Sequence, residues 1–394
     1  MGKFKSAFVM LVLLFFMWGF ITSLNDILIP HLKAVFSLSY TEAMLIQFCF
    51  FGSYFLMSLP AGWLIEKWGY ARGIVVGLTT MGIGCLLFYP ASTLINYPVF
   101  LFALFVLASG VTTLQVAANP YVAAVGPKKT ASSRLNLSQG FNSLAHTIAP
   151  IFGTYLILAD DAAAEVSSAS AVQLPYFILA FVLFILALLF SRVSLPKIHY
   201  ENEDSTSEAS IWNERYLLLG GIGIFLYVGI EVSIGGFIVN FITEPGISDL
   251  SIKEAGNYVS YYWGAAMVGR FTGSAILQKV RANLALSVAC IGALVLVATG
   301  VTASGSLAMW AVLGIGFFNS IMFSNIFTLS IEGLGTLTSR ASGVLVMAIV
   351  GGAIIPLIQG ALADSFGVQT SFIIGLVCYG YVLFFSLINR SRSK

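Results

Sequence analysis

Charged side chains are scarce in this sequence: 9% of its 394 residues are Asp, Glu, Lys or Arg, while 58% are hydrophobic. About a quarter of the residues in a soluble globular domain are charged, so a water-soluble fold of this length is excluded. Apolar stretches of about 20 residues, the length of a membrane-spanning helix, recur from Met10 almost to the C-terminus. They lack the alternation of a porin strand, so we expect α-helices to cross the bilayer.

Cysteine and histidine are also rare, with 4 and 3 residues. The cysteines lie inside apolar stretches without metal-ligand spacing, at Cys49, Cys85, Cys290 and Cys378. They indicate buried packing residues rather than a disulfide framework. The sequence also lacks a glycine-rich phosphate loop and a nucleophile elbow. We therefore predict a protein that is not an enzyme, has no metal site and needs no cofactor beyond a transported proton or sodium ion.

Twelve apolar stretches predict an all-α integral membrane fold. The expected spans are 8–30, 43–65, 73–92, 98–123, 137–159, 173–194, 214–243, 254–278, 283–303, 306–331, 341–363 and 368–389. With both termini placed in the cytoplasm, every Lys and Arg except Lys33, Lys253 and Arg270 falls on the cytoplasmic side. By the positive-inside rule, this asymmetry predicts a multi-pass protein of the bacterial-type cytoplasmic (inner) membrane with both termini inside.

The chain divides at one long polar stretch, residues 195–213, which predicts a cytoplasmic linker between two six-helix halves, 1–194 and 214–394. Matching residues recur between the halves at a constant separation: Gly110/Gly316, Asn119/Asn325, Thr130/Thr336, Ser133/Ser339, Arg134/Arg340 and Pro150/Pro356. Parallel six-helix halves with a substrate site between them are typical of the major facilitator fold. We expect transport by alternating access, with one half rocking against the other.

The segment after the second span, GWLIEKWGYAR, resembles the signature loop of that superfamily, in which charges at helix ends latch the cytoplasmic side. A tight, positively charged turn would be the simpler interpretation. We expect a cytoplasmic gate made by Glu66, Lys67, Arg72, Arg134, Arg270 and Arg340. For Arg270, in the eighth span, a structural ion pair near that gate is the favoured role.

Ionisable residues inside apolar spans are expensive and are usually retained for a task. Besides Arg270, the clear cases are Asp26 in the first span and Glu231 in the seventh. A carboxyl group in a poorly hydrated cavity can bind and release a proton, so we expect Asp26 and Glu231 to couple cation movement. Alternatively, Asp26 is held by Asn25 or a helix end, and Glu231 braces glycine-rich packing.

Carboxamides form two pairs in the first half. Gln115 and Asn119 stand four residues apart, and Gln139 and Asn142 stand three apart, so each pair shares one helix face. Amides both donate and accept hydrogen bonds, which suits the hydroxyl groups of a sugar without adding charge. The alternative is that these amides tie helices together.

The second half offers fewer amides and an aromatic cluster at Tyr258, Tyr261, Tyr262 and Trp263. Aromatic rings can pack on the apolar face of a pyranose, but Tyr and Trp also form the interfacial belt of membrane proteins. The full set of expected substrate contacts is Ser23, Gln115, Asn119, Gln139, Asn142, Tyr262, Asn319, Asn325 and Gln359.

Several strings carry a more specific likeness: WGFITSLNDILIPHLK, LQVAANPYVAAVGP, SSRLNLSQGFNSLA, YVGIEVSIGGF, YYWGAAMVGRFTGS and NSIMFSNIFTLSIEGLG. Together they resemble the fucose and glucose/galactose permease family of the major facilitator superfamily, over nearly the whole chain. The resemblance implies import of a neutral hexose or 6-deoxyhexose, such as glucose, galactose or fucose, with a proton or, in some members, sodium.

By position, the resemblance places the family's coupling aspartate on Asp26 and its polar sugar contacts on Gln139 and Asn142. The fucose permease has a glutamate where this chain has Gln115, so Asp26 would couple largely alone. That arrangement also leaves sodium open, because an ionised carboxylate among amide oxygens is a hard oxygen site.

Three other functions compete with sugar symport. A proton-coupled drug antiporter on the same fold would need an apolar cavity with acids, and an organic-anion exchanger would need several midplane cations. A non-transporting sensor would bind a ligand without flux. The clustered amides favour an uncharged polyol. We expect a monomer in the lipid bilayer with a small-molecule sugar as its partner and no nucleic acid.

Overall fold

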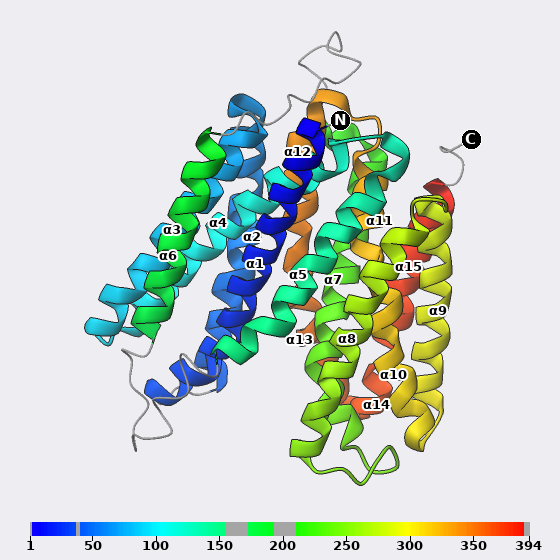
Figure 1. The fold of residues 1–394 in the computed structure, drawn as a ribbon. Helices are drawn as coiled ribbons and strands as arrows, with labels where there is room; N and C mark the ends of the chain where they lie inside the picture. The colour runs from blue at the N-terminus through cyan, green and yellow to red at the C-terminus, as the bar shows by residue number, and fades with distance from the viewer. Residues whose placement is uncertain (1, 37–39, 154–171, 193–209, 390–394) are drawn as a thin grey trace. The chain divides into compact units, whose positions relative to one another are not determined.

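The computed structural model describes the backbone of residues 2–36, 40–153, 172–192 and 210–389. Within these ranges the side chains of 2–6, 25–31, 33, 34, 40–44 and 150–153 are not described. Every regular element in the described ranges is helical (Figure 1). Most of the predicted linker, 195–213, lies outside them.

The predicted transmembrane helices are present in the described chain. Ten helical stretches are long and apolar enough to cross a membrane. The two remaining predicted spans are α5 (Ala131–Gly153) and α8 (Ile252–Ile276), which are helical but richer in polar side chains. The all-α membrane fold is thus confirmed. Polar side chains on a spanning helix turn toward the protein interior, so α5 and α8 are the natural carriers of a site.

The helices group into two compact units, each taking one segment from the other sequence half. The first unit comprises residues 1–125, 144–204 and 335–347. Its helices are α1 (Gly2–Val35), α2 (Tyr40–Trp68), α3 (Tyr70–Thr93), α4 (Tyr97–Ala124), the end of α5, α6 (Gln173–Arg192), η5 (Gly335–Leu337) and α12 (Thr338–Met347). Within it, α3, α4 and α6 pack side by side (Figure 1).

The second unit comprises residues 126–143, 205–334 and 348–394. Its helices are η1 (Lys128–Thr130), the first part of α5, η4 (Ile211–Asn213), α7 (Arg215–Ile242), α8, α9 (Ala282–Thr302), α10 (Gly305–Asn319), α11 (Met322–Ile331), η6 (Ala348–Val350), α13 (Gly351–Phe366), α14 (Val368–Ser371) and α15 (Ile374–Asn389). This grouping is a different division from the predicted halves, 1–194 and 214–394, which stay a prediction.

Three predicted spans, 306–331, 341–363 and 368–389, are interrupted rather than continuous, and the break in the first is the best defined by its contacts. Helix α10 ends at Asn319 and α11 begins at Met322. At the break, the backbone carbonyl of Asn319 accepts a hydrogen bond from the Tyr227 hydroxyl at 3.0 Å, and the Ser320 hydroxyl donates to Phe317 O at 2.6 Å. Side chains thus satisfy backbone carbonyls where the helical ladder stops, as a chain in a membrane requires.

A proline in α4 creates a similar need in the first unit. Pro120 has no N–H, so the carbonyl of Val116 lacks its usual helical donor. The hydroxyl of Ser342 on α12 donates to that carbonyl at 2.8 Å and is itself fully buried. The proline is therefore tolerated because a neighbouring helix supplies the missing hydrogen bond.

Helices α3 and α4 approach so closely that glycine is required at their crossing. A Cβ placed on Gly110 would lie 2.7 Å from Gly77 O, and one on Gly77 would lie 2.9 Å from Leu114 N. Small residues at helix crossings allow such backbone contact in membrane proteins, where packing rather than water drives association.

We expect Gly110→Val to lower the free energy of unfolding by about 1–3 kcal/mol, because its methyl groups would displace the α3 backbone. Gly380→Val on α15 is the matched control, since a Cβ there meets no atom within 4 Å. Thermal unfolding of the two purified variants in detergent gives the comparison. Equal stability of the two variants would contradict the proposed close packing.

Candidate functional site

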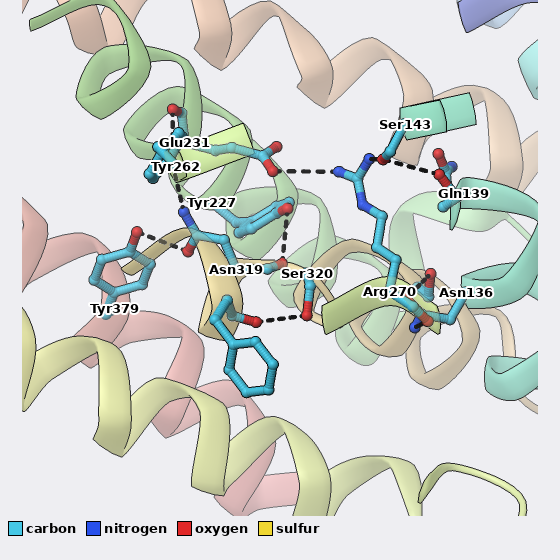
Figure 2. A network of polar contacts seen from close by, with 12 residues as sticks. Asn136, Gln139, Ser143, Tyr227, Glu231, Tyr262, Arg270, Asn319, Ser320 and Tyr379 are labelled. Atoms are coloured by element: carbon cyan, nitrogen blue, oxygen red, sulfur yellow. Dashed lines mark hydrogen bonds and ion pairs between the residues drawn. The ribbon is translucent and has the colours of Figure 1, made fainter. Parts of the chain in front are cut away.

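Arg270 on α8 is a nearly buried cation shared between two neighbouring helices of the second unit (Figure 2). Its Nη1 donates to the Ser143 hydroxyl on α5, and its Nη2 lies 3.4 Å from Oε1 of Glu231 on α7. The side chains of Arg270 and Glu231 are 13% and 11% exposed. The ion pair expected for Arg270 from the sequence is therefore made with the other predicted intramembrane charge of this unit.

The α5 side of this cluster is a polar face of the helix. Ser143 donates to the backbone carbonyl of Gln139 at 3.1 Å, one turn earlier, and Asn142 is its buried neighbour. Further along α5, Asn136 donates to the backbone carbonyl of Arg270 at 2.7 Å. The helix thus contacts both the backbone and the guanidinium of Arg270, which fixes that side chain beside the predicted sugar contacts Gln139 and Asn142.

A second chain of hydrogen bonds runs from Glu231 into the core of the second unit (Figure 2). Tyr262 donates to the backbone carbonyl of Glu231 at 3.2 Å and accepts from Asn319 Nδ2 at 2.9 Å. Tyr379 on α15 donates to Asn319 Oδ1 at 2.8 Å. Both predicted substrate contacts here, Tyr262 and Asn319, are buried and already hydrogen-bonded within the protein.

The other predicted contacts of the second unit differ in their surroundings. Gln359 is buried, accepts from Ser233 at 2.6 Å and donates to Ser371 at 3.4 Å. Asn325 is fully buried, and neither of its amide atoms has a hydrogen-bond partner in the described part of the chain. Of the aromatic cluster, Tyr261 and Trp263 are exposed, which fits the interfacial-belt alternative.

In the first unit, the predicted contacts lie on α1 and α4. Gln115 donates to the Tyr54 hydroxyl on α2 at 2.7 Å, so its carboxamide is held in one orientation. Asn119, one turn along, is fully buried and has no hydrogen-bond partner among the described residues. Ser23 on α1 donates to the backbone carbonyl of His146 at 3.2 Å.

Asp26 is placed only in part. Its backbone belongs to α1, on the turn after Ser23, and its side chain lies outside the described part of the structure. Its role as a coupling group therefore stays a prediction.

The predicted gate residues are brought together in one pair. Arg340 Nε on α12 lies 2.5 Å from Glu66 Oε2 at the end of α2. Between these helices, a Cβ on Gly343 would lie 2.7 Å from Ser58 O, so glycine permits the close approach. Two of the predicted gate residues, both in the first unit, thus form an ion pair.

The other gate candidates of the first sequence half, Lys67, Arg72 and Arg134, have different surroundings. The ammonium of Lys67 lies 5.4 Å from the ring centre of Trp63, and Arg72 is exposed. Arg134 donates to Pro127 O at 2.9 Å and to the Thr130 hydroxyl at 2.6 Å, so it stabilises the turn before α5.

Sequence reasoning missed Ser143 and Tyr54, the partners of Arg270 and Gln115. Ser143 stands four residues after Gln139, so helical spacing alone could have added it to that polar face. Tyr54 lies on another helix and has no such signal. In the described ranges, His, Cys, Asp and Glu form no group of three that could hold a metal ion.

The geometry can be compared with known proteins. The family model described as Major Facilitator Superfamily matches residues 9–349. The chain belongs to this superfamily. It is therefore a membrane transporter rather than an enzyme, as the sequence predicts, and its polar cluster lies among the spanning helices of a transporter.

Two groups of superfamily relatives are similar over almost their whole length. The glucose/galactose transporter of Brucella abortus is 55% identical over 383 residues, covering 96% of this chain and 93% of the relative. The putative glucose/galactose transporter of Helicobacter pylori is 46% identical, covering 96% and 95%. The L-fucose-proton symporter of Escherichia coli is 32% identical, covering 98% and 93%. The predicted family resemblance is confirmed.

Among solved structures, the Escherichia coli fucose:proton symporter has the same fold. Its N162A variant superposes with a TM-score of 0.89 at 30% sequence identity, covering 98% of this chain and 99% of that one. A crystal structure of the same transporter in the outward conformation gives a TM-score of 0.90. The predicted major facilitator fold is thereby confirmed.

We expect Tyr379→Phe to lower the free energy of unfolding by about 1–3 kcal/mol, because it leaves the buried Asn319 Oδ1 without its donor. The matched control is Tyr381→Phe on the same helix. Tyr381 donates to Leu219 O at 3.0 Å from a partly exposed position, so its loss should cost less. Thermal unfolding in detergent measures both, and a control at least as damaging as Tyr379→Phe would contradict the network.

Proposed function

We propose that this chain imports a neutral hexose or 6-deoxyhexose together with a proton, by alternating access. The observation that carries this proposal is the 55% identity with the Brucella abortus glucose/galactose transporter over 96% of the chain. The name of the Escherichia coli relative, an L-fucose-proton symporter, supports the proton as the coupled cation. Sodium is the alternative outcome of the transport test below.

The sugar contacts in this proposal are the amides and hydroxyls of the polar helix faces. Gln139 and Asn142 lie beside Ser143 on α5, and Gln115 on α4 is oriented by Tyr54 on α2. Asn119 is fully buried, and neither of its amide atoms has a hydrogen-bond partner in the described chain. Uncharged donors and acceptors fit sugar hydroxyls. They do not favour the lipophilic cation of a drug antiporter, which would seek acids in an apolar cavity.

The proposed substrate set has five further members, whose role is supported by fewer observations: Ser23, Tyr262, Asn319, Asn325 and Gln359. Tyr262, Asn319 and Gln359 already bond to protein groups, so in this proposal they position the walls of the site. The amide atoms of Asn325, like those of Asn119, are buried and have no hydrogen-bond partner in the described chain.

The coupling groups in the proposal are Asp26 and Glu231. Glu231 is supported by its burial and by its pairing with Arg270. Asp26 is supported by its place in an apolar span and by the family resemblance of LNDILIP. A carboxyl group that is retained in a membrane helix despite its cost is a candidate proton carrier.

The Glu66–Arg340 pair suits a latch that opens in each transport cycle. Its side chains are 30% and 39% exposed, and an exposed ion pair contributes only about 0–1 kcal/mol. Such a weak contact can break without stalling transport. We propose that it forms the cytoplasmic gate with Lys67 and Arg72 of the same segment, and with Arg134.

We further propose that the protein is a monomer in a bacterial cytoplasmic membrane, with both termini inside. The asymmetry of Lys and Arg along the chain supports this orientation. Reporter fusions at the N-terminus and after residue 389 test it. Activity of an extracytoplasmic reporter at either terminus would contradict the proposed topology.

Proteoliposomes containing the wild-type protein should concentrate galactose when a proton gradient is imposed. One charge driven by about 100 mV is worth about 2.3 kcal/mol, which corresponds to roughly fifty-fold accumulation.

Asp26→Asn should abolish accumulation while exchange of labelled galactose continues. Asp364→Asn, an exposed aspartate at the end of α13, is the matched control and should accumulate normally. Accumulation by Asp26→Asn equal to wild type would contradict the coupling role, and accumulation driven only by sodium would replace the proton.

Asn142→Ala should raise the Kd for galactose about tenfold, because it removes an amide that bonds to sugar hydroxyls and leaves a hydroxyl unpaired. Asn240→Ala, at an exposed position on α7, serves as the control and should leave the Kd unchanged. Isothermal titration of the purified variants provides both values. An unchanged Kd in Asn142→Ala would remove this residue from the binding site.

A further inference from the structure

The contact between Arg270 and Glu231 is incomplete as an ion pair. The Nη2 to Oε1 distance is 3.4 Å, whereas a charge-assisted N–H to carboxylate hydrogen bond is usually about 2.7–2.9 Å. Arg270 Nε is buried and has no hydrogen-bond partner in the described chain. A guanidinium carries five N–H donors in a planar fork. This one therefore has donor capacity that its contacts with the described residues do not use.

The unused capacity lies next to the proposed sugar contacts. The other partner of the guanidinium, Ser143, lies close to Gln139 on α5 (Figure 2). Helical spacing puts Asn142 on the same face. The Ser143 hydroxyl donates its single proton to Gln139 O, so it accepts the hydrogen bond from Arg270. A sugar held by the two amides would bring further hydroxyl oxygens, each able to accept from the guanidinium.

Loss of its arginine would leave Glu231 without a counter-ion in a buried position. The groups of the described chain that act on Glu231 by charge or hydrogen bond are Arg270, Tyr227 and Tyr262, and Tyr379 lies within electrostatic reach. Arg270 is the only cation among them. An unpaired buried carboxylate is strongly unfavourable and is relieved when the group becomes neutral.

We propose that Arg270 transmits sugar occupancy to Glu231: a sugar hydroxyl replaces Glu231 as the acceptor of the guanidinium, and the released carboxylate takes up a proton from water. The proton binds a lone pair of the carboxylate and leaves again when the sugar departs and the ion pair re-forms. Arg270 is a positioning residue in this scheme, because its guanidinium stays protonated throughout and neither takes up nor releases the coupled proton. The inference rests on the proposed sugar:proton symport and assigns one of its coupling steps.

The test is the pH dependence of galactose affinity in the purified, detergent-solubilised protein. If sugar binding takes up a proton, the Kd rises with pH, by up to about tenfold per pH unit for each proton. We expect Glu231→Gln to lower the slope of log Kd against pH by about one. Arg270→Gln should remove the same proton, because an unpaired Glu231 is already neutral before sugar binds.

The double variant decides whether the two residues act on one step. Glu231→Gln with Arg270→Gln should show the same slope as either single variant, since effects along one path do not add. Slopes that fall further in the double variant, or single variants that keep the wild-type slope, would overturn the inference. A purely structural arginine would change stability without changing the slope in any folded variant.

Ser143 supplies a milder variant in which both charges remain. Without the hydroxyl, Glu231 is the remaining partner of the guanidinium among the described residues, so a sugar hydroxyl must compete with a tighter ion pair. Ser143→Ala should therefore weaken galactose binding several-fold, while the slope of log Kd against pH stays as in the wild type. Ser138→Ala is the matched control, because its hydroxyl bonds to Arg134 O within α5. Equal affinities in the two serine variants would contradict the proposal. Failure of the proposed function appears separately, as absence of galactose accumulation by wild-type proteoliposomes.

Discussion

The structure depends on the requirement that a guanidinium placed among membrane helices find acceptors. A charge in the bilayer costs several kcal/mol unless it is paired, and the guanidinium of Arg270 is paired with one carboxylate and one hydroxyl. These partners come from α5 and α7, which flank α8 in the second unit. The same requirement makes the cluster sensitive to a ligand, because any new oxygen acceptor competes with those already present.

In the first unit, neutral side chains form hydrogen bonds with a backbone carbonyl and with an amide side chain. Ser342 satisfies the carbonyl that Pro120 leaves open, and Tyr54 orients Gln115. Asn119 is fully buried, and its amide atoms have no hydrogen-bond partner in the described chain. Apart from Asn119, these polar groups of the first unit are held by neutral hydrogen bonds, whereas the second unit holds a nearly buried ion pair.

Much of the fold follows from the sequence because hydrophobic length is a local property. The spans and the polar character of α5 and α8 could be predicted from composition, and the Arg134/Arg340 match indicated related halves. The break after Asn319 could not, because it depends on Tyr227 reaching a carbonyl from another helix. For the same reason, the sequence identified Tyr262 as a polar aromatic but did not reveal its internal partners.

The site illustrates the same limit. Helical spacing predicts that Gln139 and Asn142 share one polar face, and the same spacing would also include Ser143. Glu231 and Arg270 were recognised as rare charges, but their pairing required the packing of α7 against α8. Which amides bond to other helices depends on neighbours distant in sequence: Gln359 accepts from Ser233, whereas Asn119 has no hydrogen-bond partner in the described chain.

The most direct test of the account is the number of protons taken up when sugar binds. Galactose is added to the purified wild-type protein in weakly buffered solution with a pH-sensitive dye. The account predicts net proton uptake that saturates with the bound sugar and follows the same Kd. Saturable galactose binding without any proton uptake across the pH range would contradict the claim that a buried carboxylate couples the two.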